Sequence, residues 1–315
     1  MRVPDSLYYD LFLKYDRIRS RQLKRKTEEL SSGKSLLYPS DNPVDTTRVL
    51  RFKRLIGEIE QFNRNIDLAR TNLENAETAL NSVVQVLQEA RVKIIEIMNT
   101  GTLNGEDAKV LANYFEKVKE FVIQQGNMKL GDSYIFGGVK TQESPFEPGT
   151  GEYKGETKET TVQVGKGVEV ETNFSGLKYF GVNEESNKIT VVEVLDEIIN
   201  ILNSGDLDKL HSETIKVKLD GWTDSKELKL LDAFDAGLSS MMEYRSVLGT
   251  KQEIINSLKV QNESISLHFR DLTSRLQDTD YASAIAEYEK AKTAYEALLA
   301  AIQQTKDLSL LKYYK

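Results

Sequence analysis

The side chains that most often carry chemistry are few in this sequence. The 315 residues include no cysteine, which excludes thiol nucleophiles, disulfides and thiolate metal sites, and only two histidines, His211 and His268. The stretch Gly33-Lys34-Ser35 has the ending of a phosphate-binding loop, but the earlier glycine that such a loop needs falls on Glu28. We therefore interpret both histidines as surface or packing residues and expect no phosphate site.

Carboxylates do not form a recognisable site either. Asp206-Leu-Asp208 begins like a calcium loop, but Leu210 occupies the next ligand position. A hydrolase with paired carboxylates stays an alternative, although no spacing pairs the acidic residues available for it, which are Glu152, Glu156 and Glu159. The sequence predicts no catalytic residue, no metal and no cofactor, and we expect a protein that is not an enzyme.

One strongly charged cluster lies near the N-terminus, and it is basic. It consists of Lys14, Arg17, Arg19, Arg21, Lys24, Arg25 and Lys26. The whole chain has a net charge of −7, which argues against a nucleic-acid-binding protein. We interpret the cluster as a solvated helix face that becomes a contact between subunits, with nucleic-acid or membrane-surface binding as the alternative.

Neither a membrane span nor a secretory signal is apparent in the sequence. No apolar run approaches the ~18 residues that a transmembrane helix needs. The first twenty residues are interrupted by charges and contain no apolar signal core. We expect no membrane partner, and a route of export, if there is one, that does not read such a signal.

The elements that must position these residues are long helices. Between Phe52 and Ile97, apolar residues recur at alternating steps of three and four, the spacing that keeps one stripe facing a partner helix. At ~1.5 Å per residue this helix would be roughly 65–70 Å long, which predicts a rod. The predicted rod core consists of Leu55, Ile59, Phe62, Ile66, Leu73, Leu80, Val83, Leu87 and Ile94.

Two further helices complete the predicted rod. Glycines and asparagines in 99–105 break the first helix, and a second follows from Glu106 to Gly131, with a stripe of Leu111, Tyr114, Val118, Phe121 and Met128. A third helix is predicted from Ser225 to Leu276. Its apolar stripe contains the polar residues Arg245, Gln252 and Asn262. It is the natural partner of the first helix and brings the chain back along the rod.

The sequence between the second and third helices changes character. Residues 134–180 are rich in glycine and predict short strands and turns, with a hairpin over 161–172. Residues 191–202 predict a short helix. We interpret 139–224 as a small β-rich outer domain inserted in the rod.

Both terminal segments carry helical apolar stripes but have no core of their own. These stripes are the predicted subunit interface, formed by Leu7, Leu11, Tyr15, Ile18, Tyr281, Tyr288, Tyr295, Leu298, Leu299, Ile302, Leu308, Leu310 and Leu311. Until a neighbour covers them, we expect these segments to be largely disordered. Burial against neighbours in a head-to-tail manner would produce an open tube or filament.

The predicted fold class is mainly α: a long antiparallel coiled-coil rod with terminal helices and an inserted small β-rich, α+β outer domain. Residues 1–42 and 277–315 form the predicted terminal domain. Residues 43–138 and 225–276 form the rod.

Three stretches of this chain, near its start, in its middle and at its end, resemble the flagellin superfamily. The first follows a helix end and combines Gly33 with the segment containing Pro39, Ser40, Asp41 and Pro43. Asn42 departs from the acidic residue that is usual at this position. The second motif, Tyr134, Phe136, Gly137 and Gly138, is similar to the hook–filament junction proteins of this superfamily, as is the ending from Asp280 to Tyr313. Together these motifs point to the third hook-associated type.

The resemblance implies a structural subunit of the bacterial flagellum. Such proteins form a helical layer of their own copies between the other hook-associated junction protein and the flagellin filament. They are exported unfolded by the flagellar secretion apparatus, without a cleaved signal, and an export chaperone binds their C-terminal segment. A minor flagellin and an intracellular coiled-coil tether stay as alternatives.

Overall fold

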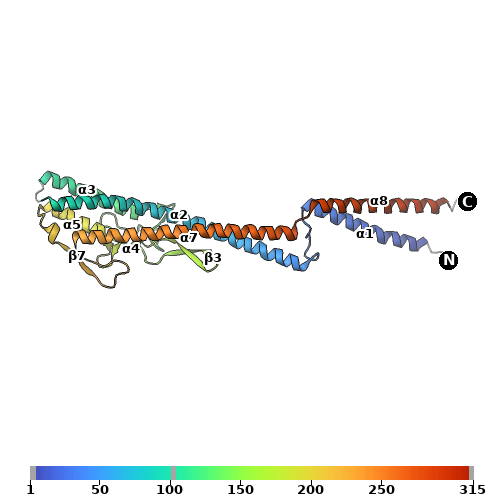
Figure 1. Cartoon of the computed structure of the whole chain (residues 1–315), viewed down its shortest axis with the longest axis horizontal. Helices are drawn as coiled ribbons and strands as arrows, with labels where there is room; N and C mark the ends of the chain where they lie inside the picture. The colour runs from blue at the N-terminus through green and yellow to red at the C-terminus, as the bar shows by residue number, and fades with distance from the viewer. Residues whose placement is uncertain (1–4, 101–103, 312–315) are drawn as a thin grey trace. The chain divides into compact units, whose positions relative to one another are not determined.

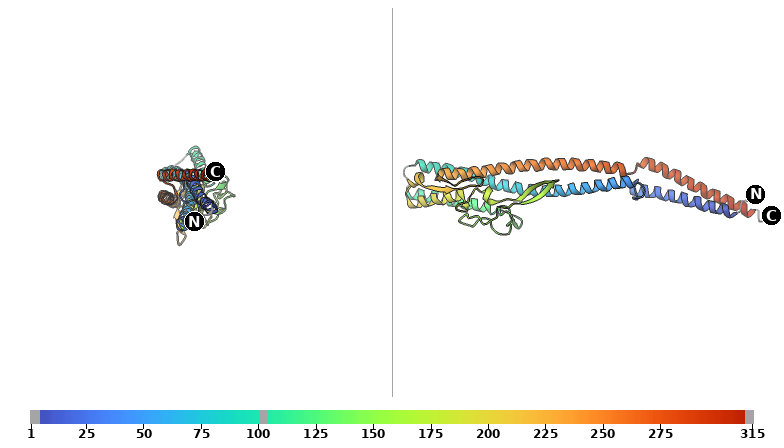
Figure 2. Two further views of the ribbon diagram at one scale, coloured as in Figure 1. Left: turned by 90° about the vertical axis from the view of Figure 1, so that its right-hand side faces the viewer. Right: turned by 90° about the horizontal axis from the view of Figure 1, so that it is seen from below.

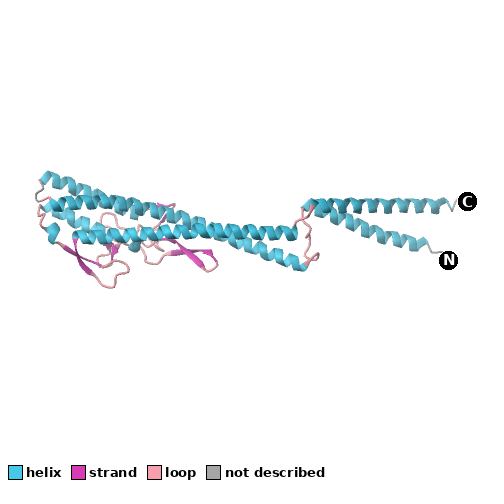
Figure 3. Cartoon of the chain, viewed as in Figure 1, coloured by secondary structure: helices cyan, strands magenta, loops and turns pink. Residues whose placement is uncertain are grey.

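The computed structural model describes the backbone of residues 5–100 and 104–311 and the side chains of residues 9–100 and 104–304. Helices dominate this part of the chain (Figure 3), with bounds α1 Asp5–Ser32, α2 Pro43–Asn99, α3 Gly105–Gly126, α4 Gly176–Tyr179, α5 Thr190–Ser204, α6 Lys209–Ser212, α7 Leu230–Gln277 and α8 Tyr281–Leu311. The predicted fold class, long helices with a small β-rich insertion, is confirmed.

Within the described residues, the strands form four separate antiparallel hairpins. Their bounds are β1 Lys129–Leu130, β2 Ser133–Tyr134, β3 Thr160–Gly165, β4 Val168–Asn173, β5 Val182–Asn183, β6 Lys188–Ile189, β7 Thr214–Val217 and β8 Lys226–Lys229. The β3–β4 pair confirms the predicted hairpin over 161–172. Helix α5 confirms the predicted helix over 191–202.

The chain divides into two compact units. We call residues 1–58 with 264–315 the terminal unit and residues 59–263 the central unit. Helices α2 and α7 each contribute residues to both. The three-part division predicted from the sequence stays a prediction.

The central unit is built on α2 and α7, which run antiparallel (Figures 1 and 2). Of the predicted rod-core residues in this unit, all but the half-buried Phe62 are buried: Ile59, Ile66, Leu73, Leu80, Val83, Leu87 and Ile94. Leu55, in the terminal unit, is half-buried. The apolar stripe of α2 therefore faces the interior over its whole course through the central unit.

Polar residues within the α7 stripe meet polar residues of α2. Arg245 Nε pairs with Glu77 Oε1 at 3.1 Å, and Asn262 Nδ2 donates to Asn63 Oδ1 at 3.1 Å. These contacts satisfy polar groups that would be costly to bury alone, and they fix the axial alignment of the two helices.

The β-rich residues share the core of the helices. Phe136, Phe146, Phe174 and Phe180 are fully buried and belong to the same cluster as Leu73 and the other buried residues of α2. Edge-to-face packing joins Phe136 to Phe180, with ring centroids 4.8 Å apart. One continuous core thus stabilises the central unit.

Two predicted helix limits are wrong. Helix α3 ends at Gly126, not Gly131, because the side chain of Asn127 bonds both backbone groups of Phe146, at 2.9 and 2.8 Å. Gly131 instead turns the chain from β1 to β2 with a φ of +61°. Helix α7 begins at Leu230, not Ser225, because residues 226–229 pair with β7.

The buried face of α3 also differs from the predicted stripe. Val118 of the predicted stripe is buried, but the other buried positions include Phe115 and Val122, whereas Leu111 and Tyr114 are half-buried. The helix is therefore turned by about one residue from the expected orientation.

In the terminal unit, α1 and α8 lie side by side and run in opposite directions (Figures 1 and 2). The same unit contains the start of α2 and the end of α7, where Phe52 stacks on Phe269 with ring centroids 5.5 Å apart. No helix in the described part of the chain has an apolar stretch long enough to cross a bilayer.

Candidate assembly interface

Helix α1 presents three different faces. The face toward α8 is half-buried and mixes apolar with charged residues at helical spacing: Phe12, Asp16, Arg19, Leu23, Lys26 and Leu30. The alkyl stems of arginine and lysine cover apolar surface while their charged ends reach solvent. The pairing with α8 therefore does not use the apolar stripe predicted to be the interface.

The predicted stripe of α1 lies on a second face and is open to solvent. Leu11, Tyr15 and Ile18 are 47%, 45% and 40% exposed. Leu7 belongs to the same predicted stripe, but its side chain lies outside the described residues. These three apolar side chains, each partly open to solvent, form a surface on which a partner helix could pack.

The predicted residues of α8 separate into two groups. Tyr288, Tyr295, Leu298 and Ile302 are half-buried on the side of α8 that carries the buried Ala284. Tyr281 and Leu299 are exposed, together with Ile285. The side chains of Leu308, Leu310 and Leu311 lie outside the described residues.

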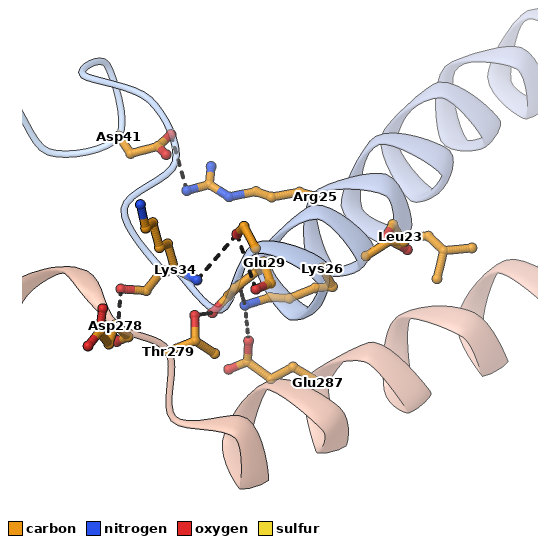
Figure 4. A network of polar contacts seen from close by, with 12 residues as sticks. Leu23, Arg25, Lys26, Glu29, Lys34, Asp41, Asp278, Thr279 and Glu287 are labelled. Carbon is orange, nitrogen blue, oxygen red and sulfur yellow. Dashed lines mark hydrogen bonds and ion pairs between the residues drawn. The ribbon is translucent and has the colours of Figure 1, made fainter. Parts of the chain in front are cut away.

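A polar network joins α1 and α8 at one end of their contact (Figure 4). Lys26 Nζ lies 2.7 Å from Glu29 Oε2 and 2.5 Å from Glu287 Oε2. Burial opposes the charged form of Lys26, but the hydrogen bonds to Glu287 and Glu29 outweigh it and raise the pKa of this lysine. The bond from Lys26 lowers the pKa of Glu287. Lys26 and Glu287 are therefore both charged at neutral pH.

The network continues into the turn between α7 and α8. Glu29 is buried and accepts from Thr279 Oγ1 at 3.5 Å. The backbone N–H of Thr279 donates to the carbonyl of Gly33 at 2.9 Å, and Ser35 N–H donates to the carbonyl of Gln277 at 2.9 Å. The end of α1 is thereby fastened to the start of α8, and the sequence did not predict this connection.

Gly33 has a specific reason to be glycine. It ends α1 in the left-handed conformation, with a φ of +69°, and its N–H donates to the carbonyl of Glu29. A Cβ built at this position would lie 2.6 Å from the hydroxyl of Tyr281. The predicted helix end at this motif is confirmed.

The rest of the first motif shapes the loop before α2. Asp41 accepts from the backbone N–H of Tyr38 at 3.1 Å and pairs with Arg25 of α1 at 3.2 Å. Asn42 caps α2, because its Oδ1 accepts from Asp45 N–H at 3.1 Å. Pro43 is the first residue of the helix, where no N–H is needed. Pro39 and Ser40 are exposed, and the uncommon Asn42 thus retains a capping side chain.

The second motif belongs to the core of the central unit. Phe136 is fully buried, and its carbonyl accepts from Gly176 N–H at 2.8 Å. Gly138 has a φ of +64°, and a Cβ there would collide with the carbonyl oxygen of Glu156. Gly137 is similarly confined by the carbonyl of Lys140. Tyr134 is half-buried in β2, and the ammonium group of a neighbouring lysine lies over its ring. This motif therefore supports folding of the central unit, and none of its residues belongs to the candidate interface.

The basic cluster is divided between paired and unpaired residues. Lys24, Arg25 and Lys26 form ion pairs with acidic side chains. Lys14, Arg17 and Arg21 are exposed and have no ion pair among the described side chains. They lie on the third face of α1, turned away from α8.

Charge is distributed unevenly between the two units. The terminal unit contains 20 basic and 15 acidic residues, a net charge of +5, whereas the central unit contains 22 and 34, a net charge of −12. This partition could not be read from the sequence before the units were known. Among the described residues, no three potential metal ligands gather in one place.

Comparison with known proteins relates this chain to the flagellum. Residues 14–141 match the family described as the bacterial flagellin N-terminal helical region. A protein of Escherichia coli named flagellar hook-associated protein 3 is 25% identical over 299 residues, covering 91% of this chain and 92% of its own. Its namesake from Salmonella typhimurium is 25% identical over 292 residues and 90% of each chain.

A solved structure shares the fold. It is a protein of Vibrio parahaemolyticus assigned as flagellar hook-associated, with a TM-score of 0.62 and 18% identity. The match covers 76% of this chain and 100% of the other. The arrangement of long helices with inserted hairpins is therefore shared by a known structure.

Proposed function

We infer that this chain, a homologue of flagellar hook-associated protein 3 over nine-tenths of its length, is a structural subunit of the bacterial flagellum. It forms an adapter layer that joins the hook side of the junction to the flagellin filament. It works by assembly and performs no reaction.

One observation carries this proposal: α1 is covered by α8 on one face and exposes Leu11, Tyr15 and Ile18 on another. A subunit with such a stripe gains by packing against neighbours. Ordering terminal segments costs roughly 1–2 kcal/mol of backbone entropy per residue, so several neighbours are needed to offset it. Growth on an existing tip meets this requirement, while assembly in free solution does not. The expected disorder of these segments before assembly stays a prediction.

The partners that we propose follow from the resemblance of the sequence to the hook–filament junction proteins. They are the other hook-associated junction protein, flagellin, and further copies of this chain in one helical layer. A flagellar export chaperone holds the C-terminal segment before secretion. The protein then lies outside the cell, at the hook–filament junction, after export without a cleaved signal.

Immunogold electron microscopy of intact flagella tests the location. An antibody raised against residues 150–185 is expected to label a single band at the boundary of hook and filament. Label along the whole filament would instead identify a minor flagellin. Protein found only in the cytosol, with unlabelled flagella, would favour the intracellular tether.

A double substitution on α8 tests the role of the terminal helices. Leu299→Asp with Ile302→Asp is expected to abolish incorporation into flagella, because both residues belong to the predicted interface of α8. The central unit should stay folded, as circular dichroism and protease resistance can show. A matched control, Ala297→Asp with Gln304→Asp, adds the same charge at exposed positions of the opposite side and should be incorporated. Normal incorporation of the first variant would contradict the proposed role.

A further inference from the structure

Asn104 is the one asparagine of the sequence that is followed by glycine, and the pair lies where α3 begins. Because glycine has no Cβ, its backbone nitrogen can approach the preceding side chain more closely than that of a residue with a side chain. Both residues are exposed, and a Cβ built at Gly105 would have no atom within 4 Å. No steric barrier among the described residues therefore separates the amide of Asn104 from the nitrogen that follows it.

We propose that Asn104 is a site of spontaneous deamidation, a modification whose only co-reactant is water. The backbone nitrogen of Gly105 attacks Cγ of Asn104, its proton leaves with Nδ2 as ammonia, and a cyclic imide forms. Water then opens this imide. Addition of water at Cγ gives aspartate, whereas addition at the main-chain carbonyl gives isoaspartate, in which the chain continues through the side-chain carboxyl carbon.

Other asparagines that precede a small residue are less suited to this reaction. Asn81, Asn203 and Asn256 are each followed by serine and lie inside α2, α5 and α7. The N–H of a residue within a helix is bonded to the carbonyl four residues earlier. Gly105 is instead the first residue of α3, and the first N–H groups of a helix have no acceptor within it. Asn104 should therefore react first.

The start of α3 holds Asn104 in a conformation that does not react. Asn104 is the N-cap of this helix, and its Oδ1 accepts from the N–H of Asp107 at 2.7 Å. Its backbone is extended, with a ψ of 158°, so the nitrogen of Gly105 is rotated out of the position for attack on Cγ. Reaction requires rotation about the Cα–C bond of Asn104, which separates Oδ1 from Asp107. The cap therefore slows the modification without preventing it.

The two products affect α3 differently. Aspartate at this position retains an oxygen for the cap and adds negative charge at the positive end of the helix, which is favourable. Isoaspartate lengthens the main chain by a methylene and turns the carbonyl that accepts from Ala108 N–H into part of a free carboxylate. Because Ala108 is buried, isoaspartate should loosen the first turn of α3.

Peptide mass spectrometry of the full chain tests the proposal. The purified protein is incubated at mildly alkaline pH and body temperature for several weeks, and its proteolytic peptides are followed over time. The expected result is that the peptide containing Asn104 converts before any other asparagine peptide. It should give two products of equal mass, aspartate and isoaspartate, which chromatography separates. Earlier conversion at another asparagine, or no conversion at Asn104, would overturn the proposal.

Gly105→Ala tests the role of the glycine. Gly105 does not have a positive φ, and its surroundings are open, so alanine fits the folded chain. The added Cβ should hinder the attack and remove most of the product at Asn104. The matched control Gly57→Ala, at another open glycine, should leave conversion unchanged. Conversion of Gly105→Ala at the original rate would overturn attack by this nitrogen.

A short peptide tests the restraint by the cap. A synthetic peptide of residues 100–110 is too short to form a stable helix in water. It should deamidate roughly two- to thirtyfold faster than the folded chain, the factor that corresponds to the usual stabilisation by an N-cap. Equal rates would overturn the restraint by the cap.

Discussion

Two helix pairs of this chain differ in how far they bury their apolar residues. They are α2 with α7 in the central unit and α1 with α8 in the terminal unit. The apolar stripe of α2 in the central unit is buried within the same chain, and residues such as Leu80 and Leu87 have no exposed surface. On α1 the apolar stripe is open, and the contact with α8 uses Phe12 and Leu23 among charged residues. One pair completes its own core, while the other leaves a surface for a partner.

This difference separates stability from assembly along the chain. Residues that hold the central unit together are expected to have little direct effect on contacts between copies. Residues of the exposed α1 stripe should affect assembly and have little effect on folding. Substitutions in the two regions can therefore test the distinction directly.

The largest expected effect comes from truncating a buried side chain of α2. Leu87→Ala should lower the free energy of unfolding by about 2–5 kcal/mol, because it removes a fully buried side chain and leaves a cavity. The matched change Leu11→Ala, on the exposed stripe, should alter it by no more than about 0.5 kcal/mol. Chemical denaturation of both variants measures the contrast. Equal losses would show that the α1 stripe is already covered within one chain.

The next effect concerns the glycine motif of the central unit. Gly138→Ala combines a positive φ with a collision against the backbone of Glu156, whereas Gly167→Ala meets a positive φ in open space. The first variant should therefore be less stable than the second by roughly 1–3 kcal/mol, the usual cost of overpacking. Thermal melting monitored by circular dichroism can compare them. Similar melting temperatures would mean that the loop of Glu156 moves aside readily.

Local sequence patterns predicted the long helices. The helix limits that were predicted wrongly depend on contacts between residues distant in sequence. The heptad spacing of α2 is visible because its buried positions are apolar, apart from Asn72. The start of α7 was misplaced because residues 226–229 pair with β7, which no local pattern reveals. The end of α3 depends on Asn127 binding the backbone of Phe146.

The candidate interface was predicted only in part. The exposed stripe of α1 follows from helical spacing, and the structure leaves Leu11, Tyr15 and Ile18 uncovered. The face that α1 turns to α8 could not be recognised, because Asp16, Arg19 and Lys26 interrupt it. The polar network needs Glu29 and Thr279 to meet across most of the chain length, which only the fold determines.

A smaller effect on stability is expected from an ion pair between α2 and α7. Arg91 binds Asp235 through two nitrogens, at 2.6 and 2.7 Å, and both side chains are partly exposed. Asp235→Asn should lower the free energy of unfolding by about 0.2–1 kcal/mol, the range for exposed pairs. The loss should shrink at high salt. A loss of several kcal/mol would show that this pair is more shielded from solvent than its exposure indicates.

The smallest expected effect is a pH dependence in the α1–α8 pair. The pKa of Glu287 is lowered by its bond from Lys26, so its contribution is present above its ordinary value of 4.5 and is lost as pH falls through the lowered value. The pKa of Lys26 is raised, so its contribution is present below 10.5 and is lost as pH rises above that range. The pair should thus be tightest near neutral pH.

Hydrogen exchange of the α8 amides can measure this dependence in the full chain. Protection corrected for intrinsic exchange should decrease when the pH is lowered from neutral to below 4.5, and Glu287→Gln should remove most of the decrease. The variant keeps the contact of Lys26 with Glu29, so the change isolates the link to α8. The same acidification should affect amides of α2 near Leu80 less, because fully buried apolar side chains stabilise that part of the helix. If Glu287→Gln retained the full decrease, a group other than Glu287 would account for the pH dependence.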